Sequence, residues 1–381
     1  MPSRKTLLIG FLVLSISTLS CLKIVAFEQN KDESSISPGV RPYPYLLLVT
    51  FYTKKSWKDI DEKWINIINN TPYNGIAVML DSVVSSKKPV TYDSIVSTLE
   101  YIRNNSKKHI WPWVFFNRFM QRKPEKRGGL SNEAWNYFNR IKGMDIYNQT
   151  GALNDFKEIF RLALKASKYT GTPGILVDHE AYNDHRLYEL SYLSKLMGKS
   201  EMEISRQLKS VGSDLAKIIA EEYPNAFLWF LSLNPNQSTT LIAEGILDEA
   251  EASSIPLTVI EGGENTIGYV NASVRKLERN LSTQQRATRE WSRKYGKHFQ
   301  IGGTIALTDT PGSRSGFIKR GYGKSNIKSV ADLKPILTRL FESRQYVFIY
   351  AASAALFNPF DLVQSKQYHS VIRDTLSTMS H

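Results

Sequence analysis

Cysteine is almost absent from this sequence: Cys21 is the only one. A single cysteine excludes an internal disulfide and a metal site built from several thiolates. Other signatures are missing as well. The chain has no H-E-x-x-H metal motif, no G-x-S-x-G nucleophile elbow, no phosphate-binding loop and no dinucleotide fingerprint. Its stability must come from its core, and we expect no cofactor.

Acidic residues are in the minority. The chain has 49 Lys and Arg and 36 Asp and Glu, a net charge of +13. Removal of residues 1–26 would leave 46 basic and 36 acidic residues, a net charge of +10. Such a surface favours anionic partners. The basic residues are scattered and no recognised nucleic-acid motif accompanies them, so we expect no nucleic-acid partner. Either the basic surface is simply solvated, or it binds an anionic glycan or the cell envelope.

Only the start of the chain carries a long apolar run. Arg4 and Lys5 precede apolar residues from 7 to 22, the layout of a secretory signal, and small residues near Ala26 suit cleavage. An uncleaved anchor and a lipidated Cys21 are the alternatives. We therefore expect the protein to be secreted or held in the cell envelope, with membrane contact only through this N-terminus. No later segment is long enough to span a membrane.

Three regions follow from composition. Residues 1–26 are the expected signal or anchor, and residues 27–41 form a polar tether rich in Ser, Pro and Gly. Residues 42–381 form the expected folded domain. Hydrophobic residues at 42% and aromatic residues at 11% supply a large core.

Short apolar runs alternate with amphipathic stretches throughout this domain. The runs are 45–52, 75–81, 109–117, 174–180, 226–233, 255–261, 301–307 and 346–352. The predicted helices are 57–69, 92–104, 151–169, 200–222, 273–295 and 330–343. Ser200 and Glu203 form a predicted capping box. Eight runs predict a (β/α)8 TIM-type barrel in a single α/β domain with elaborated loops. The weak link is 238–251, and an open doubly wound sheet would give a similar pattern.

Two acidic residues end the fourth run. Asp178 and Glu180 are separated by one residue, so in an extended chain both point to the side of Leu176. In α/β barrels the reacting groups lie at the carboxyl ends of strands. Neighbouring carboxylates raise the pKa of one of the two, as an acid catalyst requires. We therefore predict a catalytic pair; the alternative is that these acids cap a helix or pair with Arg118.

The sixth run also ends in acids. Glu261 closes the run, and Glu264 follows on a turn that two glycines permit. We expect barrel geometry to place both across the mouth from Asp178 and Glu180. Cleavage of a glycosidic bond needs one carboxyl group that protonates the leaving group and one that acts as nucleophile or as base toward water. The sequence thus predicts a glycosidase whose two roles are open among four acids.

Aromatic and polar side chains near the strand ends are the candidates for binding sugar, because sugar rings stack on aromatic faces and their hydroxyls bind polar groups. The candidates are Tyr52, Asp81, Trp113, Asn117, Arg118, Tyr182, Trp229, Asn234, Tyr269 and Asp309. For Trp113 and Trp229 the alternative is a place in the core. For Asp81 and Asp309 a helix cap or an ion pair is the favoured alternative.

The alternating runs and the D-x-E of residues 178–180 resemble the broad superfamily of (β/α)8-barrel glycoside hydrolases, over residues 42–360 and at the level of architecture. The D-x-E is similar to the end of the chitinase-type motif, in which the glutamate is the acid and the aspartate assists the substrate's acetamido group. Here GILV replaces the acids that precede it in that motif. The pattern also resembles retaining barrels of the α-galactosidase group, which implies Asp178 as nucleophile and Glu261 or Glu264 as acid/base.

Two further functional classes remain open. One is a non-catalytic barrel that binds a glycan or the cell envelope, because fold does not imply activity. The other is a metal-dependent hydrolase that uses Asp178, His179, Glu180 and His185. His179 alternates with the two acids, so we expect its side chain to point away from them. The leading prediction has no bound metal and takes an oligo- or polysaccharide, anionic ones included, as its substrate.

Overall fold

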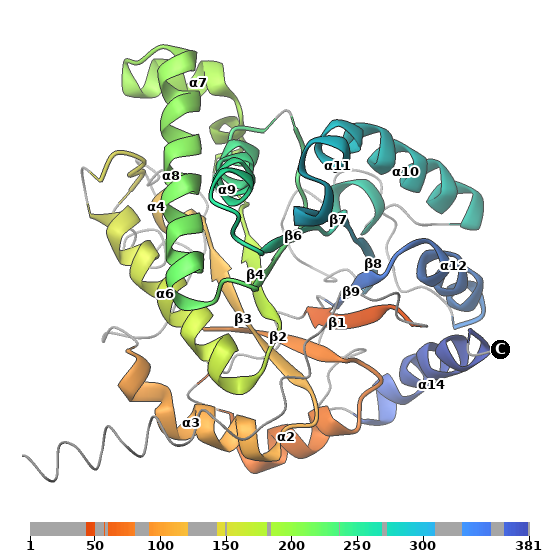
Figure 1. The fold of residues 1–381 in the computed structure, drawn as a ribbon. Coiled ribbons are helices and arrows are strands. Elements are labelled where there is room, and N and C mark those ends of the chain that lie inside the picture. The colour runs from red at the N-terminus through yellow and green to blue at the C-terminus, as the bar shows by residue number, and fades with distance from the viewer. Residues whose placement is uncertain are drawn as a thin grey trace, which may run out of the picture. The chain divides into compact units, whose positions relative to one another are not determined.

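In the computed structural model, residues 41–381 form one unit (Figure 1). The structure describes residues 43–49, 57, 60–80, 91–120, 143–148, 151–180, 184–235, 237–268, 273–308, 330–351 and 362–379. No helix in these ranges is long and apolar enough to cross a membrane. The expected leader and tether lie outside them.

Every predicted apolar run contains a strand. The strands are β1 (Tyr45–Val49), β2 (Gly75–Met79), β3 (His109–Phe115), β4 (Gly174–Asp178), β5 (Phe227–Phe230), β6 (Thr258–Glu261), β7 (Phe299–Ile301), β8 (Gly303–Thr308) and β9 (Tyr346–Ala351). They form one sheet in the order β7-β6-β5-β4-β3-β2-β1-β9-β8, and every pairing is parallel.

The barrel closes through a divided strand. β7 and β8 are consecutive in the chain and are separated only by Gly302. β7 pairs with β6, whereas β8 pairs with β9 at the other end of the sheet order. The two halves together occupy one place in the barrel, so nine strands fill eight positions. The predicted (β/α)8 barrel is confirmed.

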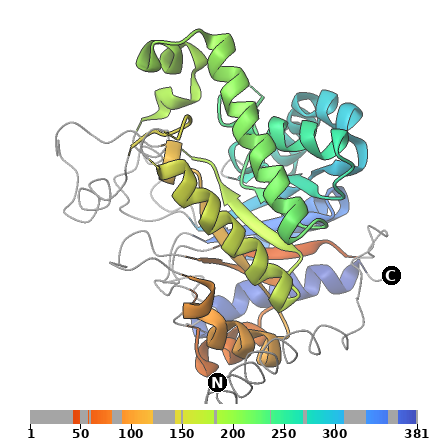
Figure 2. The same ribbon diagram turned by 60° about the vertical axis from the view of Figure 1, so that its left-hand side comes forward.

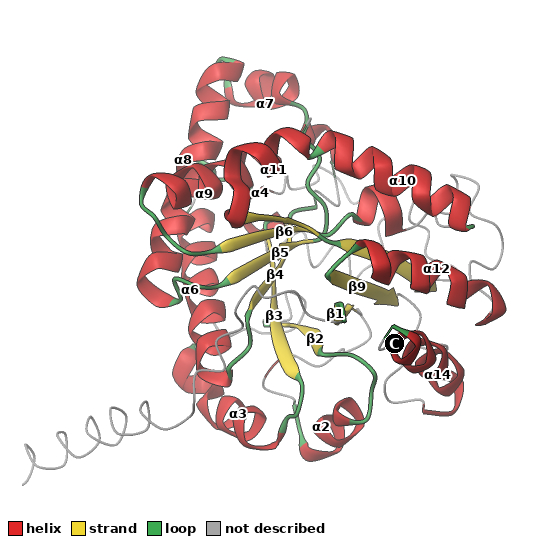
Figure 3. Ribbon diagram, turned by 45° about the vertical axis from the view of Figure 1, so that its right-hand side comes forward, coloured by secondary structure: helices red, strands yellow, loops and turns green. Residues whose placement is uncertain are grey.

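Helices connect successive strands and surround them (Figure 3). They are α2 (Glu62–Asn69), α3 (Tyr92–Asn105), α4 (Asn117–Met120), α6 (Ala152–Thr170), α7 (Leu190–Met197), α8 (Glu201–Glu222), α9 (Thr240–Ala252), α10 (Val274–Ala287), α11 (Arg289–Tyr295), α12 (Val330–Ser343) and α14 (Leu362–Thr378). The six predicted helices are confirmed, with 273–295 divided into α10 and α11. The weak stretch 238–251 contains α9. Long helices α6 and α8 pack together on the outer wall (Figure 2).

Two apolar layers hold these elements. The inner layer fills the barrel with side chains that include Trp111, Trp113, Trp229 and Phe348, all at most 1% exposed. The outer layer lies between the strands and the helices and contains the alternate strand residues, such as Val177. Because most strand residues are buried on both faces of the sheet, the strands are largely apolar.

The capping box at the start of α8 forms as predicted. The Oγ of Ser200 accepts the N–H of Glu203 at 3.3 Å, and the Glu203 carboxylate accepts the Ser200 N–H at 2.9 Å. Ser200→Ala should lower the free energy of unfolding by about 1 kcal/mol, because one helix N–H group loses its acceptor. Urea unfolding measures this loss. The exposed Ser282→Ala in α10 is the control and should change stability by less than about 0.5 kcal/mol; an equal loss in both variants would contradict the role of the cap.

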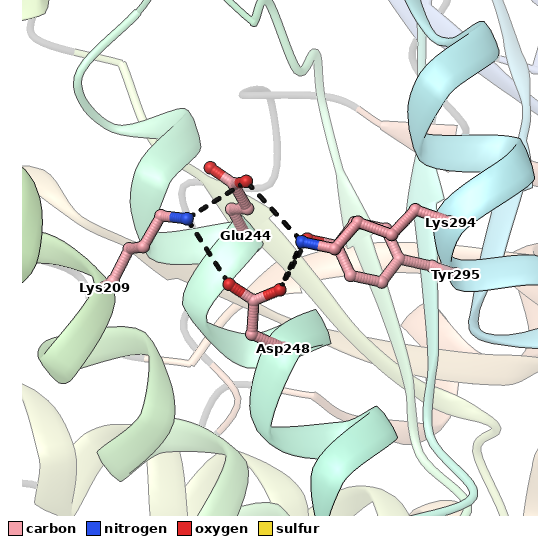
Figure 4. A network of polar contacts seen from close by, with 5 residues as sticks. All are labelled: Lys209, Glu244, Asp248, Lys294 and Tyr295. Atoms are coloured by element: carbon pink, nitrogen blue, oxygen red, sulfur yellow. Dashed lines mark hydrogen bonds and ion pairs between the residues drawn. The ribbon is translucent and has the colours of Figure 1, made fainter.

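A polar network joins three outer helices (Figure 4). Lys209 of α8 lies 3.0 Å from Glu244 and 3.3 Å from Asp248, both in α9. From α11, the ammonium of Lys294 lies 2.7 Å from Asp248, and the hydroxyl of Tyr295 donates to the same carboxylate at 2.8 Å. The network fixes α11 against α9 and neutralises Lys294.

Candidate active site

Asp178 lies on the inner face of the barrel at the carboxyl end of β4. It pairs in register with Phe115 of β3, and Leu176 pairs with Trp113. Phe115, Leu176 and Trp113 belong to the inner apolar layer, so Asp178 lies above that layer as predicted. Its side chain is only 1% exposed. Asp178 is therefore a buried acid at the rim where barrel enzymes carry their reacting groups.

Glu180 leaves the strand immediately after Asp178. The Glu180 N–H donates to the Oδ1 of Asp178 at 2.9 Å, which turns the chain at this point. Glu180 is half-buried, unlike Asp178. The structure thus keeps the two acids of the D-x-E together at the end of β4, with Glu180 nearer to solvent.

Glu264 begins the π-helix η3 (Glu264–Gly268), which follows β6. Its N–H donates to the carbonyl of Leu231, a residue of the inner layer, at 3.0 Å. Glu264 and Thr304 both lie close to Gly268, the last residue of η3. A Cβ atom built on Gly268 would be 3.0 Å from the Cγ2 of Thr304 and 3.7 Å from the Cγ of Glu264. Thr304 pairs with the inner-layer Phe348. Glu264, 4% exposed, therefore also lies on the inner side of the barrel, in a π-helix of a kind often found at functional sites.

Glu261 does not lie where the sequence predicts. In β6 its neighbour Ile260 pairs with Trp229 and belongs to the inner layer. Glu261 itself pairs with Phe230 of the outer layer. Strand alternation therefore turns Glu261 toward the helices, not across the mouth from Asp178, and this corrects the expected position.

Backbone and amide donors surround the Glu261 carboxylate. Its Oε1 accepts the N–H of Gly263 at 2.8 Å and that of Leu233 at 3.3 Å, and its Oε2 accepts the amide of Gln284. Gly263 has a φ of +79°, so the turn uses the conformation that glycine permits. Burial raises the pKa of Glu261 to about 7, against the opposing effect of these donors and of the nearby Arg344 charge.

The same donors support the divided strand. The amide of Gln284 also donates to the Gly302 carbonyl at 3.0 Å. Arg344 donates to the Oε1 of Gln284 at 2.8 Å and to the Gly302 carbonyl at 3.1 Å. Sequence reasoning missed Gln284 and Arg344. A signal for Gln284 was present, since it follows Leu277 and Leu281 on the buried face of α10, where a polar residue needs a buried partner.

Replacing Glu261 with Gln should change how stability depends on pH. The pKa of this carboxyl is about 7 in the fold and 4.5 in the unfolded chain, so between these values the folded state binds the extra proton. The wild type should therefore lose about 3 kcal/mol of stability as pH rises from about 4.5 to above 7. The uncharged Glu261→Gln should lack this loss. Urea unfolding at the two pH limits tests this; parallel curves for both proteins would contradict it.

The two candidate tryptophans lie inside the barrel. Trp113 is 1% exposed and its ring stacks on Phe115 at 4.9 Å between centroids. Trp229 is fully buried and contacts Trp111 edge-on at 5.7 Å. Both rings fill the core beneath the rim, so their positions favour the structural alternative over sugar binding.

The other candidates divide into two groups. Arg118, in α4, is half-buried near the end of β3, and Asn234, after β5, is exposed. The Asn234 carbonyl accepts the hydroxyl of Thr240 at 2.7 Å. The remaining candidates lie outside the described residues or side chains: Tyr52, Asp81, Asn117, Tyr182, Tyr269 and Asp309. Their roles stay predictions.

The histidines near the D-x-E point elsewhere. His179 is 1% exposed, and its ring lies 6.2 Å from that of Phe230 in the outer layer, so it faces away from Asp178 as predicted. Burial lowers the pKa of His179 to about 4. The ring of His185 stacks on Tyr188 instead. Within the described ranges, no three His, Cys, Asp or Glu residues lie close enough to hold a metal ion.

Neither a protein-family model nor a curated protein matches this sequence. Solved structures resemble its fold. A glycoside hydrolase family 5 enzyme from Prevotella bryantii aligns with a TM-score of 0.46 and 10% identity over 88% of this chain and 96% of its own. The catalytic domain of β-amylase from Paenibacillus polymyxa aligns at 0.44 and 8%, over 88% and 99%. Endonuclease IV from Thermus thermophilus aligns at 0.43 and 13%, over 88% and 100%. Similarity at this level bears on neither activity nor substrate.

Proposed function

We propose that this protein is an exported glycoside hydrolase that uses carboxyl groups at the carboxyl ends of β4 and β6. The observation that supports this most is the pair of buried acids on the inner side of the rim, Asp178 and Glu264, which are 1% and 4% exposed. Asp178 ends β4 and Glu264 follows β6, so both lie at the carboxyl ends of strands, the edge at which barrel enzymes carry their reacting groups. Glu261 is not part of this proposal, because its hydrogen bonds serve the divided strand.

The chemistry assigned to these acids is the cleavage of a glycosidic bond. One carboxyl group protonates the glycosidic oxygen as the bond to the anomeric carbon breaks. The other either attacks that carbon or removes a proton from the water that does so. Asp178 and Glu264 are the proposed pair, and the half-buried Glu180 is placed to bind substrate hydroxyls beside Asp178. The reaction needs no cofactor.

A glycan-binding barrel without activity is the second candidate. The same barrel and rim can bind a sugar without cleaving it, because fold does not imply activity. For either candidate we propose that residues 1–26 direct export and that residues 27–41 are a tether.

The experiment that separates the two candidates is sugar release by the full chain from a panel of neutral and anionic oligosaccharides and polysaccharides. Release of new reducing ends from at least one substrate supports the glycosidase. Binding of a glycan with no release from any substrate would overturn it and leave the binding protein.

A further inference from the structure

Basic residues are concentrated on α10, α11 and the turn that follows. Residues 273–300 contain eight Lys and Arg and two Asp and Glu, a net charge of +6. The other described residues contain 20 Lys and Arg and 25 Asp and Glu, a net charge of −5. A generally basic protein would spread this excess evenly. Within the described part, the positive charge belongs instead to one stretch of outer wall.

Six of these residues form what we call the basic face. They are Arg275, Arg279, Arg286, Arg289, Arg293 and Lys297, all exposed. No ion pair joins any of the six to another described residue. The acid nearest in sequence to Arg279 is Glu278, and Arg339 of α12 already binds it at 3.1 Å. Within the described part of the chain, no carboxylate neutralises the basic face; Arg286 donates only to the hydroxyl of Thr283, at 3.4 Å.

The arginines of α10 form a line. Leu277, Leu281 and Gln284 are buried against the barrel. At about 100° per residue, Arg275, Arg279 and Arg286 lie within about 40° of one another on the opposite side. At about 1.5 Å per residue they are spaced by about 6 Å and about 10 Å along the axis. Such a row suits a linear polymer that carries several anionic groups along its length.

We propose that the basic face binds an anionic polysaccharide, one that carries carboxylate or sulfate groups. Five of its six residues are arginines, whose planar guanidinium groups bind such anions through two parallel hydrogen bonds. The large exposed apolar residues of the described part are Tyr43, Leu196 and Met202, and none lies on α10 or α11. The face thus lacks the apolar groups with which a membrane-binding surface inserts.

The direction of α10 connects the basic face with the proposed active site. α10 begins six residues after η3, the π-helix that follows β6, and packs against it. A polymer along Arg286, Arg279 and Arg275 therefore runs toward the rim that holds Glu264. The choice of a polysaccharide over other polyanions rests on the proposed function. The concentration of positive charge on the basic face is independent of that function.

The test measures binding of the full chain to heparin and to polygalacturonate at about 0.15 M salt, where long-range effects are screened. Arg275→Gln, Arg279→Gln and Arg286→Gln are combined in one variant. Three exposed contacts, each worth about twofold in affinity, should weaken binding about tenfold. A matched control combines Lys63→Gln, Lys195→Gln and Lys366→Gln, which removes the same charge from exposed positions on three other helices. The control should bind within about twofold of the wild type.

Equal weakening in both triple variants would overturn the proposal, because net charge alone would then explain binding. No binding to either polysaccharide would overturn it too, as would tighter binding to a DNA duplex or to phosphatidylglycerol vesicles. The Asp178→Asn variant separates this proposal from the proposed function: it should bind both polysaccharides like the wild type. Binding through the arginines without sugar release from any substrate would refute the glycosidase and leave the basic face supported.

Discussion

Asp178→Asn should lower kcat for sugar release about 10³-fold, while KM changes only a few-fold. The amide has nearly the shape of the carboxyl group and can still accept the Glu180 N–H at Oδ1. It cannot attack the anomeric carbon or exchange the proton that the reaction requires, and loss of such a group costs roughly 10² to 10⁴ in rate. Initial rates at saturating substrate measure this effect.

The matched control is Glu100→Gln, an exposed carboxylate on α3 of the outer wall. It should leave kcat unchanged. If Asp178→Asn retains more than about a tenth of the activity, Asp178 is not a catalytic residue.

Gly212→Ala should lower the free energy of unfolding by about 3 kcal/mol. A Cβ on Gly212 of α8 would lie 2.1 Å from the Ile242 carbonyl oxygen of α9, and one on Gly245 would lie 2.1 Å from the Lys209 carbonyl oxygen. The backbones of α8 and α9 therefore touch, and a methyl group must push the helices apart. This cost exceeds the roughly 1 kcal/mol that alanine gains over glycine inside a helix. Urea unfolding measures the difference.

Met202→Ala serves as the control in the same helix. Met202 is 65% exposed, so its truncation should change stability by less than about 0.5 kcal/mol. Equal stability of Gly212→Ala and the wild type would mean that α8 and α9 do not pack as closely as the structure has them.

Most of the barrel can be predicted because its strands are buried on both faces and read as uninterrupted apolar runs. The division at Gly302 cannot be predicted, since only Gly302 separates β7 from β8 in the chain and the two strands are distinguished by their pairing partners. Helix α9 is hard to recognise in the sequence for another reason. Its Gly245 is a poor helix former, but close contact with α8 requires it there.

The positions of the candidate catalytic acids can also be predicted only in part. Asp178 can be placed from the sequence because it lies two residues after Leu176 in β4. The two side chains therefore point to the same face, and Leu176 belongs to the inner layer. In β6 the residues on both sides of the strand are apolar, so the sequence does not reveal that Ile260 faces inward and Glu261 outward. A shift of one residue along a strand moves every side chain to the opposite face of the sheet. Strand alternation does not predict where the Glu264 side chain points, because Glu264 lies in η3, after β6 has ended.

The central claim is that the inner rim acids, and not Glu261, carry out glycoside cleavage. Sugar release by equal amounts of folded wild type, Asp178→Asn, Glu264→Gln and Glu261→Gln tests it most directly. The account predicts that release is lost in the first two variants and retained in Glu261→Gln. Release that survives in Asp178→Asn and Glu264→Gln, or that is lost only in Glu261→Gln, would contradict it.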